Sequence, residues 1–363
     1  MNNSAPKLLV MAGGTGGHIF PGLAVAKALE QQGWQIHWLG TANRMEADIV
    51  PSHGYPIAFI NIAGLRNKGW QTLLKMPFKL LQSLMQSIKV IRGINPDVVL
   101  GMGGYASAPG GVAAWLLRKP LVLHEQNAVA GMSNRYLARL AKTVLSAFPN
   151  AFKSSISHTV VGNPLRKDIV ELEHTLSAEP SSSKKVLVVG GSLGAQVFNE
   201  TVPAGIKQIQ QQKIDVWHQT GKGNLASVKQ KYQDSGLDEN KVKVSEFIED
   251  MSEAYRWADV VVCRAGALTV SELAMAGKPA IFVPLPHAVD DHQTKNANYL
   301  VSRGAAKLLP QKDFNGTTLA QMLNSMFSSD KVVHSMSQAA LDAAHADATI
   351  KVANACKELV SHA

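Results

Sequence analysis

Two stretches decide the fold: Leu8-Leu-Val-Met-Ala-Gly-Gly-Thr-Gly-Gly17 and Lys185-Val-Leu-Val-Val-Gly-Gly-Ser-Leu-Gly194. They align without gaps at an offset of 177 residues, and each joins an apolar run of strand length to a glycine-rich turn. A continuous apolar run is typical of a strand buried on both faces of a parallel sheet, and glycines let the chain turn directly into a helix. The repeat therefore predicts two similar halves, each starting a Rossmann-like sheet.

The segments around these stretches alternate between strand and helix patterns. Lys7–Met11, Pro21–Gln32 and Gln35–Leu39 form one β-α-β pattern. Further strands are predicted at Val98–Gly101, Leu121–His124, Val144–Ser146, Lys185–Val189, Val216–Gln219, Val260–Cys263 and Ala280–Pro284. We expect an α/β protein with two Rossmann-like domains that face each other across a cleft.

The domain boundary is expected near Pro164, where proline and a polar stretch to Ser183 interrupt the periodicity. This gives an N-terminal domain over residues 1–164 and a C-terminal domain over residues 165–343. The tail, residues 344–363, has a helical pattern and is expected to pack back on the N-terminal domain.

Composition excludes several classes of protein. Hydrophobic residues make up 46% of the 363 residues and charged residues 17%, which excludes a disordered chain and a protein with many membrane spans. The two cysteines, Cys263 and Cys356, are too few for a disulfide framework and lack the spacing of a zinc site. The polar start, Met1–Lys7, predicts no signal peptide and a cytoplasmic location.

The excess of positive over negative charge is confined to the first half of the chain. Residues 1–165 hold fifteen Lys and Arg against five Asp and Glu, whereas residues 166–363 hold twenty-one against twenty-two. No acidic residue lies between Asp48 and Asp97. A basic face of this kind indicates an anionic partner, which is a membrane surface, a nucleic acid or a phosphorylated substrate.

The first glycine-rich turn, Gly13-Gly-Thr-Gly-Gly-His18, precedes a helix and is suited to binding an anion through backbone N–H groups. It lacks the third glycine of a dinucleotide fingerprint and the lysine of a P-loop. No acidic residue follows the second strand in Leu39–Arg44, which disfavours a nicotinamide dinucleotide. Phosphate or pyrophosphate recognition remains.

His18 has two interpretations. It is either a polar residue at the helix N-terminus that bonds to backbone, or a general base that takes a proton from a sugar hydroxyl. The second role requires an orienting group, either a carboxylate such as Glu125 or a backbone group.

Two further polar loops follow strands in the first half. Gly101-Met-Gly-Gly-Tyr-Ala-Ser-Ala-Pro-Gly-Gly111 includes Gly103, Gly104 and Tyr105, and either allows tight helix packing or binds a ligand. His124-Glu-Gln-Asn127 places four polar side chains at a strand end, where ligands bind in parallel sheets. We expect a functional role for at least one of these four.

In the second half, Arg264-Ala-Gly-Ala-Leu-Thr-Val-Ser-Glu272 follows a strand and opens a helix. The N–H groups of Ala267, Leu268 and Thr269 are expected to point at a phosphate. Glu272 is either the acceptor for a ribose diol or a glutamate favoured by the helix dipole.

Four residues of the loop Pro284–Gln293 suggest a metal site: His287, Asp290, Asp291 and His292. Because the chain has no Asp-x-Asp pair to chelate a nucleotide-bound cation, we predict no metal site.

The segment from Trp70 to Arg92 is amphipathic at helical spacing, and its core-facing residues are expected to be Leu81, Leu84, Ile88 and Ile91. Apolar and basic residues without any acid also alternate here, as on a surface that touches anionic lipid. This predicted membrane patch consists of Lys68, Trp70, Leu73, Lys75, Phe78 and Lys79. A solvated helix face is the alternative.

Taken together, these motifs resemble the bacterial peptidoglycan glycosyltransferases of family 28. The match runs over nearly the whole chain, in seven segments: Gly13–Pro21, Gly101–Tyr105, His124–Asn127, Val161–Arg166, Gly190–Ala195, Arg264–Glu272 and Asp291–Gln293. The resemblance implies a two-domain GT-B fold with no cofactor, in which the C-terminal domain holds most of the UDP-N-acetylglucosamine donor. It also implies that the N-terminal domain takes the undecaprenyl-pyrophosphoryl-N-acetylmuramoyl pentapeptide acceptor, and it places the enzyme on the cytoplasmic face of the inner membrane, against anionic phospholipid.

The resemblance also implies residue roles. Arg166 and Ser192 would contact donor phosphates, Ile248 would read uracil through its backbone, and Glu272 would hold the ribose. Asn127 and Gln293 would bind the amino sugar. Thr15, Gly16 and Gly17 would close over the donor and acceptor pyrophosphates, with His18 as the base, and the Gly103–Tyr105 turn would lie on the acceptor side.

A single base without a carboxylate nucleophile suits one displacement that inverts the anomeric carbon, with UDP leaving as an anion stabilised by helix N-termini and Arg166. Two other enzyme classes fit the same frame, a UDP-sugar 2-epimerase and another GT-B glycolipid synthase. A non-enzymatic nucleotide-binding module fits less well, because it leaves His18 and two anion turns without a role.

Overall fold

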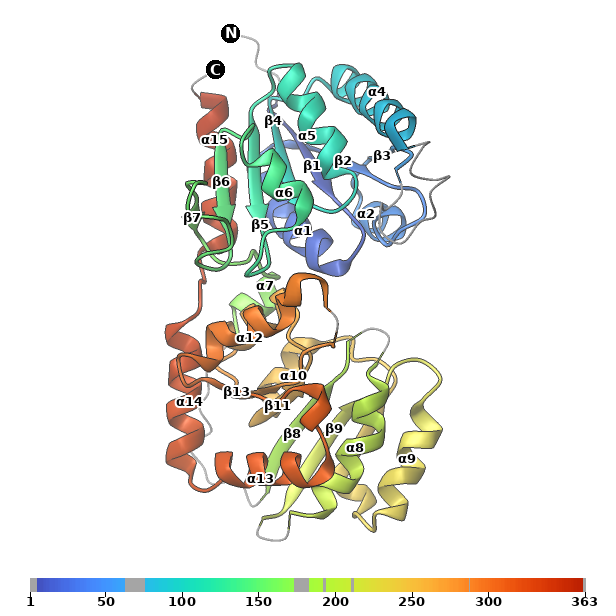
Figure 1. Ribbon diagram of the computed structural model, residues 1–363, viewed down its shortest axis with the longest axis vertical. Helices are drawn as coiled ribbons and strands as arrows, with labels where there is room; N and C mark the ends of the chain where they lie inside the picture. Colours follow the sequence, from blue (N-terminus) through green and yellow to red (C-terminus); the bar gives the residue numbers. More distant parts are fainter. Residues whose placement is uncertain are drawn as a thin grey trace. The chain divides into compact units, whose positions relative to one another are not determined.

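The structure is a computed structural model that describes residues 5–62, 76–172, 183–191, 194–209, 212–286 and 288–361. The chain divides into two compact units (Figure 1). Unit 1 contains residues 1–166 and 345–363, and unit 2 contains residues 167–344. Each is an α/β unit built on one parallel sheet, as the sequence predicts.

Unit 1 holds a seven-stranded parallel sheet in the order β3-β2-β1-β4-β5-β6-β7. The strands are β1 (Lys7–Ala12), β2 (Gln35–Gly40), β3 (Ile57–Phe59), β4 (Val98–Gly103), β5 (Leu121–Glu125), β6 (Thr143–Ser146) and β7 (Thr159–Val160). Its helices are α1 (Gly16–Glu30), α2 (Glu46–Ser52), α4 (Met76–Ile94), α5 (Ser107–Leu116), α6 (Met132–Leu137) and α15 (Ala348–Ser361).

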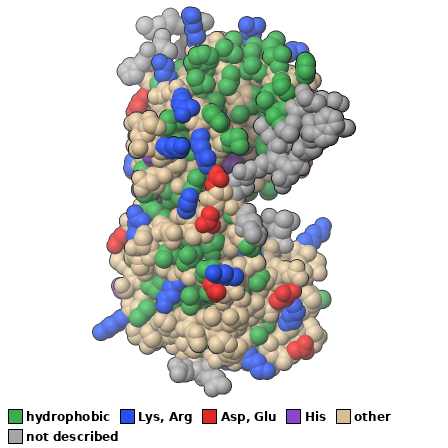
Figure 2. All heavy atoms as spheres, viewed as in Figure 1, with side chains coloured by type: hydrophobic (Ala, Val, Ile, Leu, Met, Phe, Trp, Pro, Cys, Tyr) green, Lys and Arg blue, Asp and Glu red, His purple; other side chains and the backbone are tan. Residues whose placement is uncertain are grey.

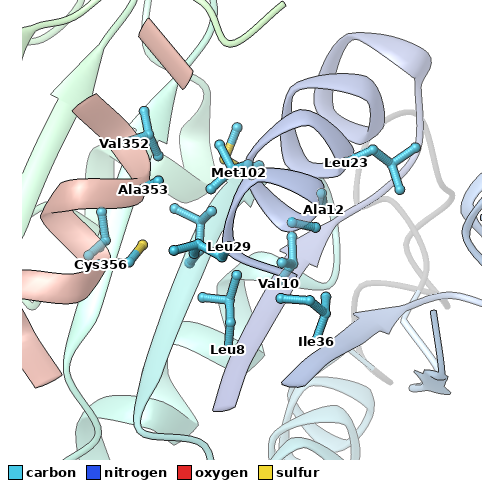
Figure 3. Close-up of a cluster of buried hydrophobic side chains, with 14 of the residues drawn as sticks. Leu8, Val10, Ala12, Leu23, Leu29, Ile36, Met102, Val352, Ala353 and Cys356 are labelled. Carbon is cyan, nitrogen blue, oxygen red and sulfur yellow. The ribbon is translucent and has the colours of Figure 1, made fainter. Parts of the chain in front are cut away.

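The sheet of unit 1 is covered on both faces, because side chains of β1 alternate between two cores. Leu8 and Val10 lie in one core with residues of α1 and α15. Leu9 and Met11 lie in the other with residues of α4, α5 and α6. Figure 3 shows Val352, Ala353 and Cys356 of α15 beside the first core. The C-terminal helix is therefore part of the core of unit 1.

Unit 2 holds a six-stranded parallel sheet in the order β10-β9-β8-β11-β12-β13. The strands are β8 (Lys184–Val189), β9 (Ile214–Gln219), β10 (Val242–Ser245), β11 (Val260–Cys263), β12 (Ala280–Phe282) and β13 (Ala306–Leu308). Its helices are α7 (Lys167–Val170), α8 (Gln196–Lys207), α9 (Leu225–Asp234), α10 (Met251–Trp257), α11 (Ala267–Met275), α12 (His292–Val301), α13 (Gly316–Met326) and α14 (Asp330–Asp342), with 3-10 turns η1 (Glu239–Lys241), η2 (Val289–Asp291) and η3 (Gln311–Asp313).

The predicted strands all occur, and four further strands were not predicted: β3, β7, β10 and β13. Each of these four lies at an edge of its sheet and is only partly buried, whereas β11 and β12 are as short but fully buried. The first helix begins at Gly16 and contains Pro21, whereas the sequence predicted a start at Pro21. Glycine has a low helix propensity, so the first turn of α1 has no sequence signal.

Candidate functional site

The glycine turns after β1 and β4 fit together because neither carries a side chain at the contact. Gly104 has φ +91°, and a Cβ on it would overlap the carbonyl oxygen of Gly13. Gly103 has φ +100°, and a Cβ on it would lie 3.1 Å from Nε2 of His18. The Ser107 hydroxyl of α5 donates to Met11 O at 3.0 Å and to Gly103 O at 2.7 Å, which joins the two strand ends.

The same glycine-rich loop also serves helix packing, the simpler of its two predicted roles. A Cβ on Gly110 would overlap the Met11 side chain, and a Cβ on Gly111 would lie 2.6 Å from Cδ2 of Leu137. Gly103 and Gly104 therefore shape the turn, whereas Gly110 and Gly111 let α5 approach the sheet and α6.

His18 lies in the first turn of α1 with its ring half-buried against Gly103. Its Nδ1 is 3.2 Å from Gly13 O and 3.4 Å from Thr15 Oγ1. A carbonyl oxygen accepts and cannot donate, so the bond to Gly13 assigns the proton to Nδ1 and leaves Nε2 as the basic nitrogen. This is the tautomer that a general base with a reactive Nε2 needs.

Both carboxylate oxygens of Glu125 accept hydrogen bonds from the loop that follows it and from α6. Its Oε1 accepts from the Asn127 N–H at 2.9 Å and from Asn127 Nδ2 at 3.3 Å. Its Oε2 accepts from the Gly131 N–H at 3.0 Å and from Asn134 Nδ2 at 2.9 Å. Of the two orienting groups expected for His18, the described contacts favour the backbone carbonyl of Gly13, and Glu125 instead fixes Asn127 and Asn134.

Asn134 was missed by the sequence analysis. It lies on α6, is 2% exposed, and donates from Nδ2 to His124 O at 3.2 Å as well as to Glu125. Its Oδ1 has no hydrogen-bond partner in the described structure. A Cβ on Gly103 would lie 3.7 Å from Asn134 Nδ2, so this side chain borders the same turn as His18. The sequence Asn134-Arg-Tyr136 contains no motif that would identify Asn134 as a site residue.

His124 is a buried core residue. Its Nε2 donates to Gly162 O at 2.9 Å, and its Nδ1 accepts from Gln126 Nε2 at 3.1 Å. Burial lowers the pKa of His124 to about 4, although the Gly162 carbonyl acts in the opposite direction. The imidazole is neutral at pH 7 and ties β5 to the Val161–Pro164 segment.

Glu46 is a second residue that the sequence analysis missed. Its carboxylate accepts from the Gly14 N–H at 2.9 Å, from the Thr41 N–H at 3.0 Å and from Thr41 Oγ1 at 2.6 Å. The stretch Leu39–Arg44 has no acid, but α2 returns Glu46 to the end of β2. Because Glu46 is 0% exposed and bonded within the protein, it cannot receive a ribose diol.

The residues of unit 2 that were predicted to bind the donor lie at the carboxyl ends of its strands. Ala267, Leu268 and Thr269 form the first turn of α11, after the N-cap Gly266. Glu272 lies beyond this first turn, so the helix dipole gives no reason for its position. The Tyr255 hydroxyl of α10 donates to Glu272 Oε2 at 2.9 Å and fixes the carboxylate.

Other side chains hold the loops around α11. Nη1 of Arg264 donates to Val283 O at 3.0 Å, and its Nη2 donates to Gln311 Oε1 at 2.8 Å. Gln293, in the first turn of α12, accepts from the Leu285 N–H at 2.9 Å. Ile248 is buried in the loop between β10 and α10.

The remaining predicted residues differ in how far the structure describes them. Arg166 is half-buried at the end of unit 1. Tyr105 is 42% exposed, with the Arg44 guanidinium 5.6 Å from its ring centroid. Five residues lie outside the described part of the chain: Lys68, Trp70, Leu73, Lys75 and Ser192. His287 also lies outside it, and the described residues contain no group of three or more His, Cys, Asp or Glu that could hold a metal ion.

The helices α4 and α5 pack together and expose apolar side chains. Phe78 is 76% exposed and Leu81 and Met85 are each 58% exposed, while Trp115 of α5 is 52% exposed. The prediction that Leu81 faces the core is wrong, whereas the same prediction for Leu84, Ile88 and Ile91 is confirmed. The buried residues of α4 are Ser83, Ser87 and Ile91. Figure 2 shows hydrophobic side chains gathered over this part of unit 1, with Lys and Arg nearby.

No helix among the described residues is long and apolar enough to span a membrane.

Two family models match the chain. The glycosyltransferase family 28 N-terminal domain matches residues 8–146, and the glycosyltransferase family 28 C-terminal domain matches residues 185–352. The first match spans strands β1 to β6 of unit 1, and the second spans strands β8 to β13 of unit 2.

Curated relatives match almost the full length. A protein of Colwellia psychrerythraea is 59% identical over 98% of this chain and 93% of its own length. One of Aeromonas hydrophila is 55% identical over 98% of this chain and 97% of its own length. Both are named UDP-N-acetylglucosamine--N-acetylmuramyl-(pentapeptide) pyrophosphoryl-undecaprenol N-acetylglucosamine transferase.

Among solved structures, that of Acinetobacter baumannii MurG superposes with a TM-score of 0.86 at 39% identity, over 97% of this chain and 99% of that one. A structure titled as a UDP-N-acetylglucosamine 2-epimerase of Listeria monocytogenes gives 0.69 at 16% identity, over 99% and 98% of the two chains. The second likeness concerns the fold alone.

Replacement of Gly104 by alanine is expected to lower the free energy of unfolding by more than the positive φ alone would cause. The Cβ would meet the Gly13 backbone, so we expect a loss of about 3 kcal/mol in the free energy of unfolding. Gly33→Ala is the matched control, because Gly33 has φ +85° and no atom within 4 Å of the new Cβ, and it should lose about 1 kcal/mol. Urea unfolding of both variants measures this; equal losses would contradict the interlocked turn.

The buried His124 predicts an acid-sensitive fold. Its pKa in the folded state, about 4, lies below the ordinary 6.5, so the unfolded chain binds the proton more readily. The stability that the neutral imidazole contributes is complete above pH 6.5 and is lost as the pH falls toward 4, by about 3 kcal/mol in total. His124→Gln keeps a donor for Gly162 and cannot titrate. Urea unfolding at pH 7.5 and pH 4.5 should therefore show a smaller pH effect in the variant; an equal effect would refute this.

Proposed function

The chain belongs to glycosyltransferase family 28, and we propose that His18 and the loops around it carry out the transfer that defines its relatives. The chain is an N-acetylglucosaminyltransferase of peptidoglycan synthesis. It moves N-acetylglucosamine from UDP-N-acetylglucosamine to undecaprenyl-pyrophosphoryl-N-acetylmuramoyl pentapeptide, which converts lipid I to lipid II. The proposal concerns the residues, the attacking hydroxyl and the stereochemistry.

The geometry of His18 is the observation that supports this proposal most. A neutral imidazole with its proton on Nδ1, held by Gly13 O, has a basic Nε2 beside Gly103. That nitrogen takes the proton of the C4 hydroxyl of the N-acetylmuramoyl sugar as the hydroxyl oxygen attacks the anomeric carbon. The bond from this carbon to the UDP oxygen breaks at the same time, so the configuration inverts and UDP leaves.

The leaving UDP requires stabilisation of its negative charge. The N–H groups that open α11, at Ala267, Leu268 and Thr269, supply partial positive charge, and Arg166 supplies a full one. The carboxylate of Glu272, fixed by Tyr255, accepts from the ribose hydroxyls, and the backbone of Ile248 reads the uracil. Ser192 is assigned to the donor phosphates by its motif alone.

The amino sugar and the acceptor are assigned to polar ends of strands and helices. Asn127 is fixed by Glu125, and Gln293 is fixed by the Leu285 N–H, so both amides have set orientations. Thr15, Gly16 and Gly17 open α1, where first-turn N–H groups suit the pyrophosphates. The exposed Tyr105 lies next to Gly103 and Gly104 on the proposed acceptor side.

The alternative functions have less support. The 2-epimerase and the glycolipid synthase share the fold, but the relatives above 50% identity carry the transferase name. A binding module without activity leaves unexplained why an imidazole is held in the tautomer of a base.

We further propose that unit 1 binds the anionic cytoplasmic face of the inner membrane through α4 and α5. The exposed residues Phe78, Leu81, Met85 and Trp115 provide the apolar area, and Lys79 provides charge. Burial of such side chains in the headgroup region, together with attraction of basic residues, is how peripheral proteins hold to a bilayer. Trp115 of α5 thus extends the patch that the sequence predicted.

His18→Ala is expected to reduce kcat/KM for acceptor-dependent UDP release by about 100-fold or more, because the variant has no base. His53→Ala is the control, since His53 is exposed at the end of α2. NMR of the product should show a β linkage formed from the α donor. A product with an α linkage would rule out a single displacement, and full activity of His18→Ala would remove His18 from this role.

The double variant Phe78→Ser with Met85→Ser is expected to bind vesicles of phosphatidylglycerol about tenfold more weakly or worse, because two exposed apolar side chains no longer enter the lipid. Ile350→Ser is the matched control, since Ile350 is 60% exposed on α15, away from the patch. Vesicle sedimentation measures the binding. Binding equal to that of the unmodified protein would exclude α4 as the docking element.

A further inference from the structure

We infer that Glu46 is a positioning residue for His18, acting through the peptide group that joins Gly13 to Gly14. The inference rests on the proposed role of His18 as the base. Glu46 lies on another helix, α2, and its described side-chain hydrogen bonds are to Gly14 and Thr41. Its connection to His18 is therefore indirect.

One peptide group carries both contacts. The Gly14 N–H donates to Glu46 Oε2 at 2.9 Å, and Gly13 O, at the other end of the same amide, accepts from Nδ1 of His18 at 3.2 Å. In a trans peptide the N–H and C=O point in opposite directions, so the carboxylate and the imidazole lie on opposite sides of one planar unit. The order is carboxylate, N–H, C=O, imidazole N–H.

A hydrogen bond at one end of an amide strengthens the bond at its other end. A negative carboxylate at the Gly14 N–H draws electron density toward Gly13 O and makes this oxygen a better acceptor. The better acceptor holds Nδ1–H more firmly and favours the imidazolium that forms when Nε2 takes a proton. Glu46 thereby has the role of the carboxylate in a catalytic triad, with a peptide group in between.

The surroundings of Glu46 fix it in place. All three of its described partners are donors, the pattern that suits an acceptor-only carboxylate. A Cβ on Gly40 would lie 2.8 Å from Cγ of Glu46, and a Cβ on Gly13 would overlap its carboxylate. Two glycines therefore make room for this one side chain, which is 0% exposed.

Three uncharged residues from three segments lie against the His18 ring: Gly13 after β1, Thr15 at the start of α1, and Gly103 at the end of β4. The carboxylate of Glu125 is shared among Asn127, Gly131 and Asn134. The carboxylate of Glu46 has a hydrogen-bonded path to the imidazole through a single peptide group.

The test compares Glu46→Gln with the control variant Glu30→Gln. Glu30 is the last residue of α1, at the end far from His18, and its carboxylate accepts a hydrogen bond from the Tyr55 hydroxyl. The ring of His18 is followed by NMR titration in the protein alone, assigned with His18→Ala. We expect the midpoint of this titration to fall by about half a pH unit in Glu46→Gln and to be unchanged in Glu30→Gln. We also expect kcat to fall about tenfold with little change in KM.

A second variant separates charge from packing. Thr41→Val removes one donor to Oε1 and keeps both the carboxylate and its bond to Gly14. Its titration midpoint should stay the same or rise, because the carboxylate is then shared among fewer donors. An unchanged midpoint in Glu46→Gln, or an equal fall in Thr41→Val, would overturn the inference. If His18→Ala kept full activity, the proposed base would fail, while the NMR titration would still decide the role of Glu46.

Discussion

The peptide group between Gly13 and Gly14 is the point at which the site of unit 1 is assembled. Three segments meet at this peptide. It follows β1, the Glu46 side chain reaches it from the start of α2, and Gly104 contacts it from the turn after β4. A Cβ on Gly13 or Gly104 would occupy space that another group already fills. His18 donates to this peptide, so the orientation of its imidazole depends on a steric constraint among glycines.

In unit 2, side-chain hydrogen bonds rather than a backbone peptide group hold the loops at the strand ends. The elements that we propose for the donor are held by side chains, since Tyr255 fixes Glu272 and Arg264 joins the ends of β11 and β12 to Gln311 of η3. Under the proposed function, unit 1 orients the base through a backbone group, and unit 2 holds polar groups for the nucleotide through side chains. The repeat in sequence explains the shared sheet, and the differences after the strands explain the separate roles.

Much of the fold can be predicted from the sequence because buried parallel strands consist of continuous runs of apolar residues. β1 and β8 are evident for this reason, and so is the glycine turn after each. β7, with two residues, has no such signal. His18 and Glu272 could be chosen as candidate site residues from their motifs. Glu46, Asn134 and Trp115 were missed because their roles come from tertiary contacts: α2 returns Glu46 to β1, and α5 places Trp115 beside α4. The orienting group for His18 was left open between Glu125 and the backbone, and only the folded chain distinguishes them.

The account depends on a neutral His18 that carries its proton on Nδ1. The most direct measurement is the tautomer itself, read from the two ring nitrogens of ¹⁵N-labelled protein by long-range ¹H–¹⁵N correlation at neutral pH. The account predicts a protonated Nδ1 and an unprotonated Nε2 in the unliganded enzyme. A proton on Nε2 with a bare Nδ1 would contradict it, because Gly13 O could then no longer accept from the ring, and the nitrogen assigned to the acceptor hydroxyl would already be occupied.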